Sequence, residues 1–230
     1  MNTSLINEKK NKVQNDAVES WKLNPQSTVI MHTGTGKTFT FFKALLESGC
    51  KQVLFLAETT LREQTVLEDA KKFKKLFGIN PLARKKFVFM CYHSAYKTSI
   101  QNVFPKGQVF VCADEVHEMC TLTRWQFVNN SDWEGHLFLG LTATLDKQDS
   151  EELQMSKWEF LSQKFPVCFE YNIDLAKEDG TTRNLEVWTF LHQLDNQTKN
   201  IESGSQKTGY FKQTELQKYT YLNDDFKKKL

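Results

Sequence analysis

The sequence predicts an α/β domain in which a mainly parallel sheet lies between two layers of helices. Two observations carry this prediction. Short runs that are apolar on both faces recur along the chain, and stretches with helical spacing separate most of them. Strands of this kind, alternating with helices, are typical of a parallel sheet that is covered on both sides. The carboxyl ends of such strands meet at one edge, where ligands bind in these folds.

Each expected element has a local reason. The strands are runs rich in apolar, β-branched and aromatic residues, which suit a buried pleated surface. In chain order they are 27–31, 52–57, 86–92, 108–113, 136–141 and 167–171. The helices are the stretches whose apolar residues recur at helical spacing. In chain order they are 10–21, 37–47, 60–77, a shorter one after His93, and 149–164.

The regular alternation fades after about Asp179, which divides the chain into two parts. We predict a nucleotide-binding type of domain over 1–180, because 230 residues suffice for one packed domain and an appendage. Residues 181–230 are then a linker, a C-terminal extension or the start of a truncated second domain. Within them, 195–205 is rich in Asn, Gln, Ser and Gly, which suits a linker.

Bulk composition limits the classes of function. The formal net charge is only +2, so nucleic-acid binding has to come from a local patch rather than from the overall charge. No apolar run approaches the roughly 18 residues that a bilayer span needs, and the polar stretch 1–13 does not resemble a secretory signal. The five cysteines form no C-x-x-C pair. We therefore expect no membrane partner and a cytoplasmic protein, in the host cytoplasm if a phage encodes it.

A phosphate-binding loop is expected between the strand 27–31 and the helix that follows it. The sequence there is His32-Thr33-Gly34-Thr35-Gly36-Lys37-Thr38. The two glycines allow consecutive backbone N–H groups to point at phosphate oxygens, and the helix N-terminus adds its positive dipole. Lys37 can reach the β- and γ-phosphates, and the Thr38 hydroxyl can ligate Mg²⁺. The general pattern begins with glycine, where this chain has Met31.

Two adjacent carboxylates supply the complementary half of an ATP-hydrolysing site. Asp114 and Glu115 directly follow the apolar run that ends the predicted strand 108–113. In such a pair one carboxylate holds Mg²⁺, usually through water, and the next deprotonates the attacking water. The interval from Lys37 leaves room for two strand–helix units. We therefore predict ATP and Mg²⁺ as ligands, with Lys37, Asp114 and Glu115 as the catalytic residues and Thr38 and Asp114 at the metal.

With these motifs the chain resembles the superfamily 2 helicases and translocases, and most closely their phage and restriction-enzyme branch. The resemblance covers about 10–180 and implies a RecA-like P-loop NTPase domain. It implies that Gln14 reads adenine, and that loop residues Thr33, Gly34, Thr35 and Gly36 bind ATP beside Lys37 and Thr38. His117 in the Asp-Glu-Val-His box, with Thr142 and Thr144 in Thr-Ala-Thr, would couple the ATP state to nucleic-acid binding.

The same resemblance implies a nucleic-acid surface. Thr59, Thr60 and Ser94 fall on motifs that touch the nucleic-acid backbone in that family, although Thr60 is equally suited to capping its helix. Arg62, in the first turn of that helix, is expected to be solvated rather than bound to nucleic acid. Lys71, Lys72, Lys74 and Lys75 are expected to form a solvent-exposed helix face rather than a DNA-binding surface. DNA is favoured over RNA as the partner.

The family's motor needs a second RecA-like domain, whose Q-x-x-G-R-x-x-R element supplies arginines to the γ-phosphate. Residues 181–230 are too few for it and contain one arginine, Arg183. We therefore expect an ATP hydrolase that is weak in isolation, with the second domain supplied in cis or in trans. Two alternatives stay open: a non-catalytic or partner-dependent nucleotide- or DNA-binding module, and a fragment of an RNA helicase.

Overall fold

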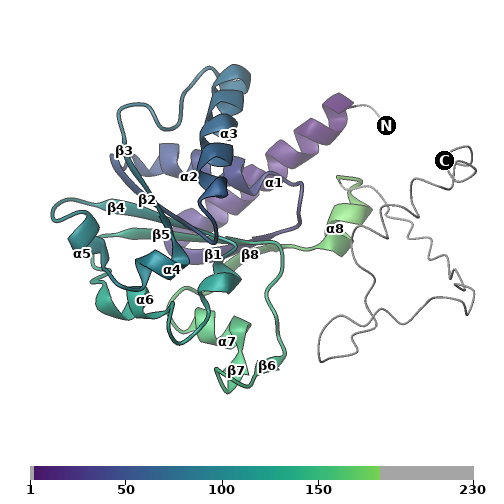
Figure 1. Cartoon of the computed structure of the whole chain (residues 1–230). Coiled ribbons are helices and arrows are strands. Elements are labelled where there is room, and N and C mark those ends of the chain that lie inside the picture. The colour runs from purple at the N-terminus through teal and green to yellow at the C-terminus, as the bar shows by residue number, and fades with distance from the viewer. Residues whose placement is uncertain (1–2, 182–230) are drawn as a thin grey trace, which may run out of the picture. The chain divides into compact units, whose positions relative to one another are not determined.

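A six-stranded sheet forms the centre of the computed structural model, which describes residues 3–181 (Figure 1). Its strands are β1 (Gln26–Met31), β2 (Gln52–Ala57), β3 (Lys86–Cys91), β4 (Val109–Asp114), β5 (Leu137–Thr142) and β8 (Val167–Tyr171). They lie in the order β3-β2-β4-β5-β1-β8, and every neighbouring pair is parallel. The predicted parallel sheet is confirmed, with strand ends shifted by one residue at most.

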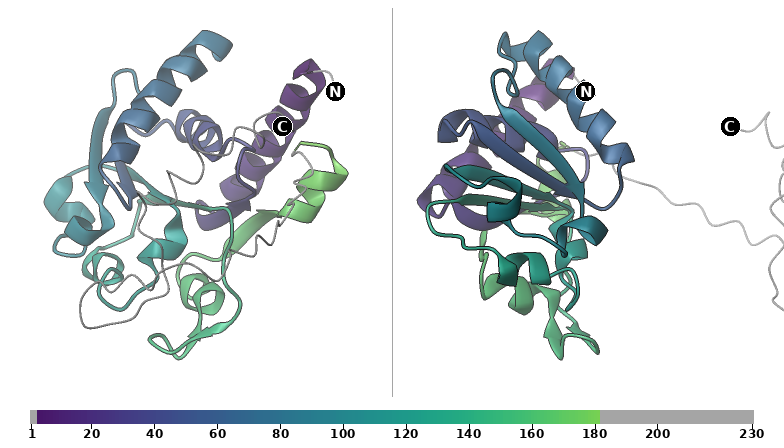
Figure 2. Two further views of the ribbon diagram at one scale, coloured as in Figure 1. Left: turned by 45° about the vertical axis from the view of Figure 1, so that its right-hand side comes forward. Right: turned by 60° about the vertical axis from the view of Figure 1, so that its left-hand side comes forward.

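Helices cover both faces of this sheet, as Figures 1 and 2 show. The first layer holds α1 (Thr3–Leu23), α2 (Lys37–Ser48) and α3 (Leu61–Phe77), and α8 (Ile173–Glu178) packs into the same core. The second layer holds α4 (Tyr92–Ala95), α5 (Ile100–Val103), the 3-10 helix η1 (Val116–Met119), α6 (Gln126–Asn130) and α7 (Lys157–Ser162). The predicted three-layer architecture is confirmed.

Alternate residues of each strand supply the two cores. In β2, Val53 and Phe55 pack with α1, α2 and α3, whereas Leu54 and Leu56 pack with the opposite layer. All four side chains are fully buried. This two-sided burial explains why the strands read as continuous apolar runs rather than as alternating ones. Helix α1 is tied to the sheet by Trp21, whose indole N–H donates to the carbonyl of Phe138 at 2.8 Å.

One expected helix is wrong over its first half. The chain 149–164 begins with a short hairpin of β6 (Asp149–Ser150) and β7 (Met155–Ser156), and α7 starts only at Lys157. The reason is the capping box at Ser156, whose hydroxyl accepts from the Glu159 N–H while the Glu159 carboxylate accepts from the Ser156 N–H. Gln154, with φ 54°, turns the hairpin.

Two further expectations concern the C-terminal segment and membrane spans. The segment predicted as a linker, a C-terminal extension or the start of a second domain is 181–230. All of it but Thr181 lies outside the described residues, so its predicted role stays a prediction. Within residues 3–181, no helix combines the length and the apolar character that crossing a membrane requires.

Candidate nucleotide and cation site

The order of the strands brings three separate motifs to one edge of the sheet. β4, β5 and β1 are neighbours, with Asp114 paired to Leu141 and Thr142 paired to Ile30. Their carboxyl ends lead directly into the loop before α2, the acidic pair and the Thr-Ala-Thr segment. Residues that are far apart in the sequence therefore converge where a parallel sheet places its ligands.

The loop after β1 has the backbone that phosphate binding requires. Gly34 and Gly36 have φ angles of 85° and 96°, a left-handed region that glycine adopts without steric cost. Gln14 on α1 is 5% exposed, and its side-chain amide donates to the Thr35 carbonyl at 2.9 Å. Gln14 thus holds the loop backbone in place. Thr33 and Gly34 are exposed at the tip of the loop, where they are accessible to a ligand.

Lys37 and Glu115 face each other across the site. The Lys37 ammonium lies 2.7 Å from Glu115 Oε1, and the Lys37 side chain is only 11% exposed. Glu115 has φ 49° and ψ 56°, a left-handed conformation that costs a non-glycine residue about 1–3 kcal/mol and is frequent at functional sites. Burial by itself raises the pKa of Glu115. The hydrogen bond and charge of Lys37, with smaller contributions from His117 and the Ala143 N–H, outweigh burial, so the pKa lies below the usual value of 4.5. Glu115 is therefore ionised at neutral pH.

Arg62 contacts both of the expected magnesium ligands. Its Nε lies 2.5 Å from Asp114 Oδ2, and its Nη2 donates to the Thr38 hydroxyl at 2.8 Å. The prediction that Arg62 is solvated is wrong, because β2 lies next to β4 and the first turn of α3 therefore reaches the end of β4. Sequence reasoning missed this contact because it depends on the order of the strands and not on a local pattern around Arg62.

The predicted coupling residues form a chain of contacts behind the acidic pair. His117 Nδ1 lies 2.9 Å from the Thr142 hydroxyl and 3.5 Å from Glu115 Oε2. The Thr142 hydroxyl is 3.3 Å from the same Glu115 oxygen and donates to the Thr144 carbonyl at 2.6 Å. Glu115, the β5 end and η1 are thus physically linked.

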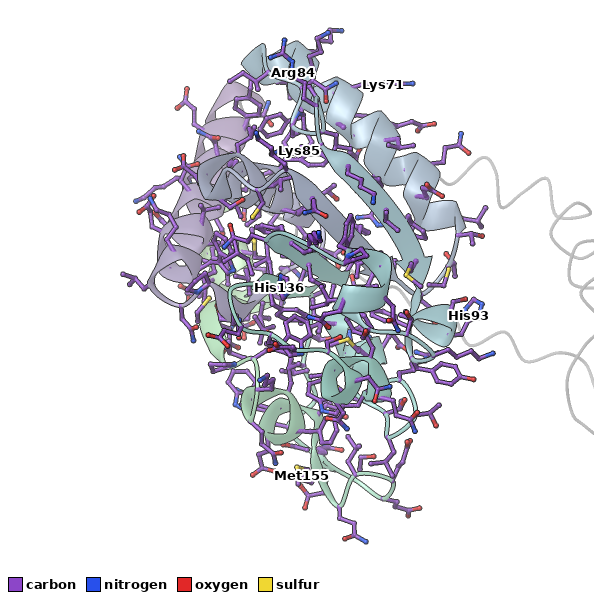
Figure 3. The ribbon with its side chains drawn as sticks, turned by 90° about the vertical axis from the view of Figure 1, so that its left-hand side faces the viewer. Lys71, Arg84, Lys85, His93, His136 and Met155 are labelled. Carbon is purple, nitrogen blue, oxygen red and sulfur yellow. The ribbon has the colours of Figure 1, made fainter. Side chains whose placement is uncertain are left out.

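The residues predicted to touch nucleic acid lie along the same sheet edge. Thr59 and Thr60 follow β2 and Ser94 lies in α4 after β3, two strands that are paired through Ala57 and Cys91. All three side chains are exposed. Thr60 occupies the N-cap position of α3, but its side chain makes no capping hydrogen bond. Figure 3 labels His93, the neighbour of Ser94, at the surface of this part of the molecule.

The side chains at the edge fit a divalent cation. Asp114 is 5% exposed, and its Oδ1 is a buried oxygen that has no hydrogen-bond partner within residues 3–181. A buried carboxylate oxygen without a donor is costly unless a cation or water completes it. The Thr38 hydroxyl is bridged to the same carboxylate by one guanidinium, so the two groups lie close enough to share a hydrated ion. Hydroxyl and carboxylate oxygens are the ligands that Mg²⁺ prefers.

The close approach of Gln14 predicts the effect of a methyl group at Gly36. A Cβ at Gly36 would lie 2.4 Å from Gln14 Nε2, whereas a Cβ at Gly34 would meet nothing within 4 Å. Both positions carry the strain of a positive φ, about 1–2 kcal/mol for a residue with a Cβ. Gly36→Ala is therefore expected to lower the free energy of unfolding by about 1 kcal/mol more than Gly34→Ala, because the Gln14–Thr35 bond is lost as well. Chemical denaturation measures both variants, and equal losses would contradict the supporting role of Gln14.

Fold and motifs together are those of a RecA-like domain of the kind found in superfamily 2 helicases. The family model described as "Type III restriction enzyme, res subunit" matches residues 7–147, more than half of the chain. The chain belongs to this family. Among curated proteins no match is found.

Solved structures support the same fold. The ATP-dependent Type ISP restriction-modification enzyme LlaBIII bound to DNA matches with a TM-score of 0.53 and 18% identity, covering 74% of this chain and 15% of that one. The UvsW helicase from bacteriophage T4 matches with a TM-score of 0.52 and 14% identity, covering 68% of this chain and 58% of that one. The chain therefore corresponds to a minor part of the first protein and somewhat over half of the second.

Proposed function

We propose that this chain is the ATP-binding half of a DNA helicase or translocase, and that it hydrolyses ATP at the γ-phosphate. The observation that carries the proposal is the direct contact of Lys37 with Glu115 at the carboxyl edge of a parallel sheet, beside Thr38 and Asp114. These are the cation, base, hydroxyl and carboxylate that phosphoryl transfer to water requires. Membership of a helicase-type family supports the same reading.

The proposed chemistry assigns one task to each side chain. The loop N–H groups and Lys37 bind the phosphates and stabilise the charge that develops on the γ-phosphate. Thr38 and Asp114 would hold Mg²⁺, which when bound neutralises charge on the phosphate oxygens. Glu115, which is ionised, orients and deprotonates the attacking water once Lys37 turns to the phosphates.

A cavity beside the loop is the proposed site of the base. It has a volume of about 450 Å³, within the range of small-molecule sites, and it lies against the glycine loop. Gln14, Phe39 and Phe77 are among its lining residues. The two aromatic rings, 6.2 Å apart, offer apolar surface to a purine, and Gln14 offers polar atoms to its edge.

The proposed coupling path leads from Glu115 through Thr142 and His117, which are in contact, to the β5–β6 connection. The proposed DNA surface is the exposed row of Thr59, Thr60 and Ser94, whose hydroxyls can donate to phosphate oxygens. The structure of the Type ISP enzyme contains bound DNA, which favours DNA over RNA as the partner of this chain. We propose a cytoplasmic location, where ATP and DNA meet, and the host cytoplasm if a phage encodes the chain.

We further propose that fast turnover needs a second RecA-like domain, in cis or in trans. Of the arginines within residues 3–181, Arg62 pairs with Asp114 and Arg124 pairs with Glu118, while Arg84 is exposed on the loop before β3. An arginine delivered to the γ-phosphate is worth about 10³- to 10⁵-fold in rate. The chain by itself is therefore expected to hydrolyse ATP slowly.

Hydrolysis and nucleic-acid binding by the purified chain test the proposal. We expect saturable ATP binding, slow hydrolysis, and DNA bound more tightly than RNA of the same length at equal salt. Binding of ATP without any hydrolysis, with or without DNA, would favour a non-catalytic module instead. Tighter binding of RNA would favour an RNA motor, and rapid DNA-stimulated turnover would contradict the need for a second domain.

A further inference from the structure

Both cationic side chains of the site are paired with its acidic residues. Lys37 is bound to Glu115 at 2.7 Å, and Arg62 is bound to Asp114 at 2.5 Å. The two pairs differ in consequence. Lys37 belongs to the phosphate loop and has phosphate oxygens as its alternative partners. Arg62 comes from a different element, α3, and its partners are the two groups proposed to hold Mg²⁺.

The guanidinium of Arg62 bridges the two oxygens that are proposed to hold the hydrated ion. Its Nε and Nη2, two nitrogens of one rigid planar group, reach Asp114 Oδ2 and Thr38 Oγ1 respectively. Mg²⁺ sits about 2.0–2.1 Å from a direct oxygen ligand and usually keeps several of its waters. The small octahedral ion with its water shell and the guanidinium cannot occupy the space between these two oxygens together.

We propose that Arg62 is an internal competitor of Mg²⁺ that sets how strongly nucleotide binding depends on the cation. Its guanidinium satisfies Asp114 and Thr38 in the arrangement seen here, and loading of Mg²⁺·nucleotide requires Arg62 to leave both oxygens. Asp114 is nearly buried and Arg62 is 26% exposed, so the arginine is the partner that can move toward solvent. Asp114 Oδ1, which has no donor within residues 3–181, is left for a water of the incoming ion.

This inference rests on the proposed function, because it assumes that the site binds Mg²⁺·nucleotide. It adds a role for a residue outside the loop and the acidic pair. A guanidinium that merely supported Asp114 would stay in place when the cation binds, and its removal would weaken binding of the metal complex. A competitor has the opposite effect, because its removal abolishes the displacement step.

The test is the Mg²⁺ dependence of ADP binding, measured by calorimetric titration in EDTA and in MgCl₂ for the wild type and Arg62→Met. The quantity compared is the dissociation constant of ADP in EDTA divided by that in MgCl₂. We expect this ratio to be at least about tenfold larger in Arg62→Met than in the wild type, because a factor of about ten corresponds to one lost charge-assisted interaction. Arg84→Met is the matched control, since it removes an exposed arginine from the loop before β3 and should leave the ratio unchanged. Figure 3 shows Arg84 well separated from His93, the neighbour of Ser94.

A second variant and a second readout cover the case in which Arg62→Met folds poorly. Arg62→Lys keeps the charge but lacks the fork that bridges two oxygens, so its ratio should lie between those of the wild type and Arg62→Met. MgCl₂ alone should raise the Tm of both variants more than that of the wild type. In Arg62→Met the guanidinium partner of Asp114 is lost, and in Arg62→Lys it is partly lost, so Mg²⁺ supplies a partner that the wild type already has.

The outcomes are distinguishable. An unchanged or smaller ratio in the Arg62 variants, with ADP still bound, would overturn the competitor role and leave the proposed function standing. Failure of the wild type to bind ADP in either buffer would overturn the proposed function, and this inference with it.

Discussion

Replacing Glu115 with glutamine is expected to lower the rate of ATP hydrolysis by about 10²- to 10⁴-fold while leaving ATP binding nearly intact. Glutamine has the size and shape of glutamate, and at position 115 it would adopt the same left-handed backbone conformation, with φ 49°. The substitution therefore changes the charge and little else. It can still accept a hydrogen bond from Lys37, which lies 2.7 Å from the carboxylate. What it cannot do is remove a proton from water.

Single-turnover hydrolysis with saturating ATP measures the chemical step for this variant. Glu118→Gln is the matched control, because Glu118 lies three residues further on and contacts His117 Nε2 at 3.2 Å and Arg124 at 3.1 Å rather than Lys37. Its rate should stay within about tenfold of the wild type, below the roughly 10²- to 10³-fold that one group aimed at the developing charge contributes. If Glu115→Gln hydrolyses ATP as fast as the wild type, Glu115 is not the base.

Replacing Lys37 with alanine is expected to weaken ATP binding by about 100-fold or more. Two charge-assisted hydrogen bonds to phosphates, each worth about 1.5–3 kcal/mol, correspond to that loss. The Lys37 side chain is 11% exposed, and Lys37 begins α2 directly after Gly36, so its ammonium is held at the phosphate loop. The variant also releases Glu115, which is 39% exposed and can be solvated, so folding should be retained.

Fluorescence titration with a labelled ATP analogue measures this loss. Lys72→Ala is the control, because Lys72 is an exposed lysine of α3 that pairs with Asp69 on the same helix at 2.9 Å. Surface pairs of this kind contribute little, so its affinity should match that of the wild type. If Lys37→Ala binds the ATP analogue as tightly as the wild type does, the proposed phosphate-binding role of the loop is contradicted.

Much of the site could be predicted from the sequence because its signals are local. Glycines that need a positive φ, a lysine and a threonine at the start of a helix, and two carboxylates at a strand end are each written into a few consecutive residues. The strand runs that are apolar on both faces predicted the parallel sheet from equally local signals. The convergence of the motifs then follows from the rule that strands in such sheets end at a common edge.

Arg62 could not be placed from its own neighbourhood. On α3 it is one of many charged residues, and a first-turn arginine is usually solvated. Its contact with Asp114 depends on β2 lying beside β4, which is a property of the strand order and not of any local pattern. The helix start at Lys157 was missed for a different reason. A capping hydroxyl at Ser156 outweighed the helical spacing of the residues before it.

Titration of the wild-type chain with ATP in the presence of MgCl₂ tests the central claim most directly, since every proposed role begins with a nucleotide at the edge formed by β1, β4 and β5. The expected result is saturable binding of one ATP per chain, with slow release of phosphate from the bound nucleotide. Absence of saturable binding up to millimolar ATP, by a chain that is folded as judged from its thermal unfolding, would contradict the claim.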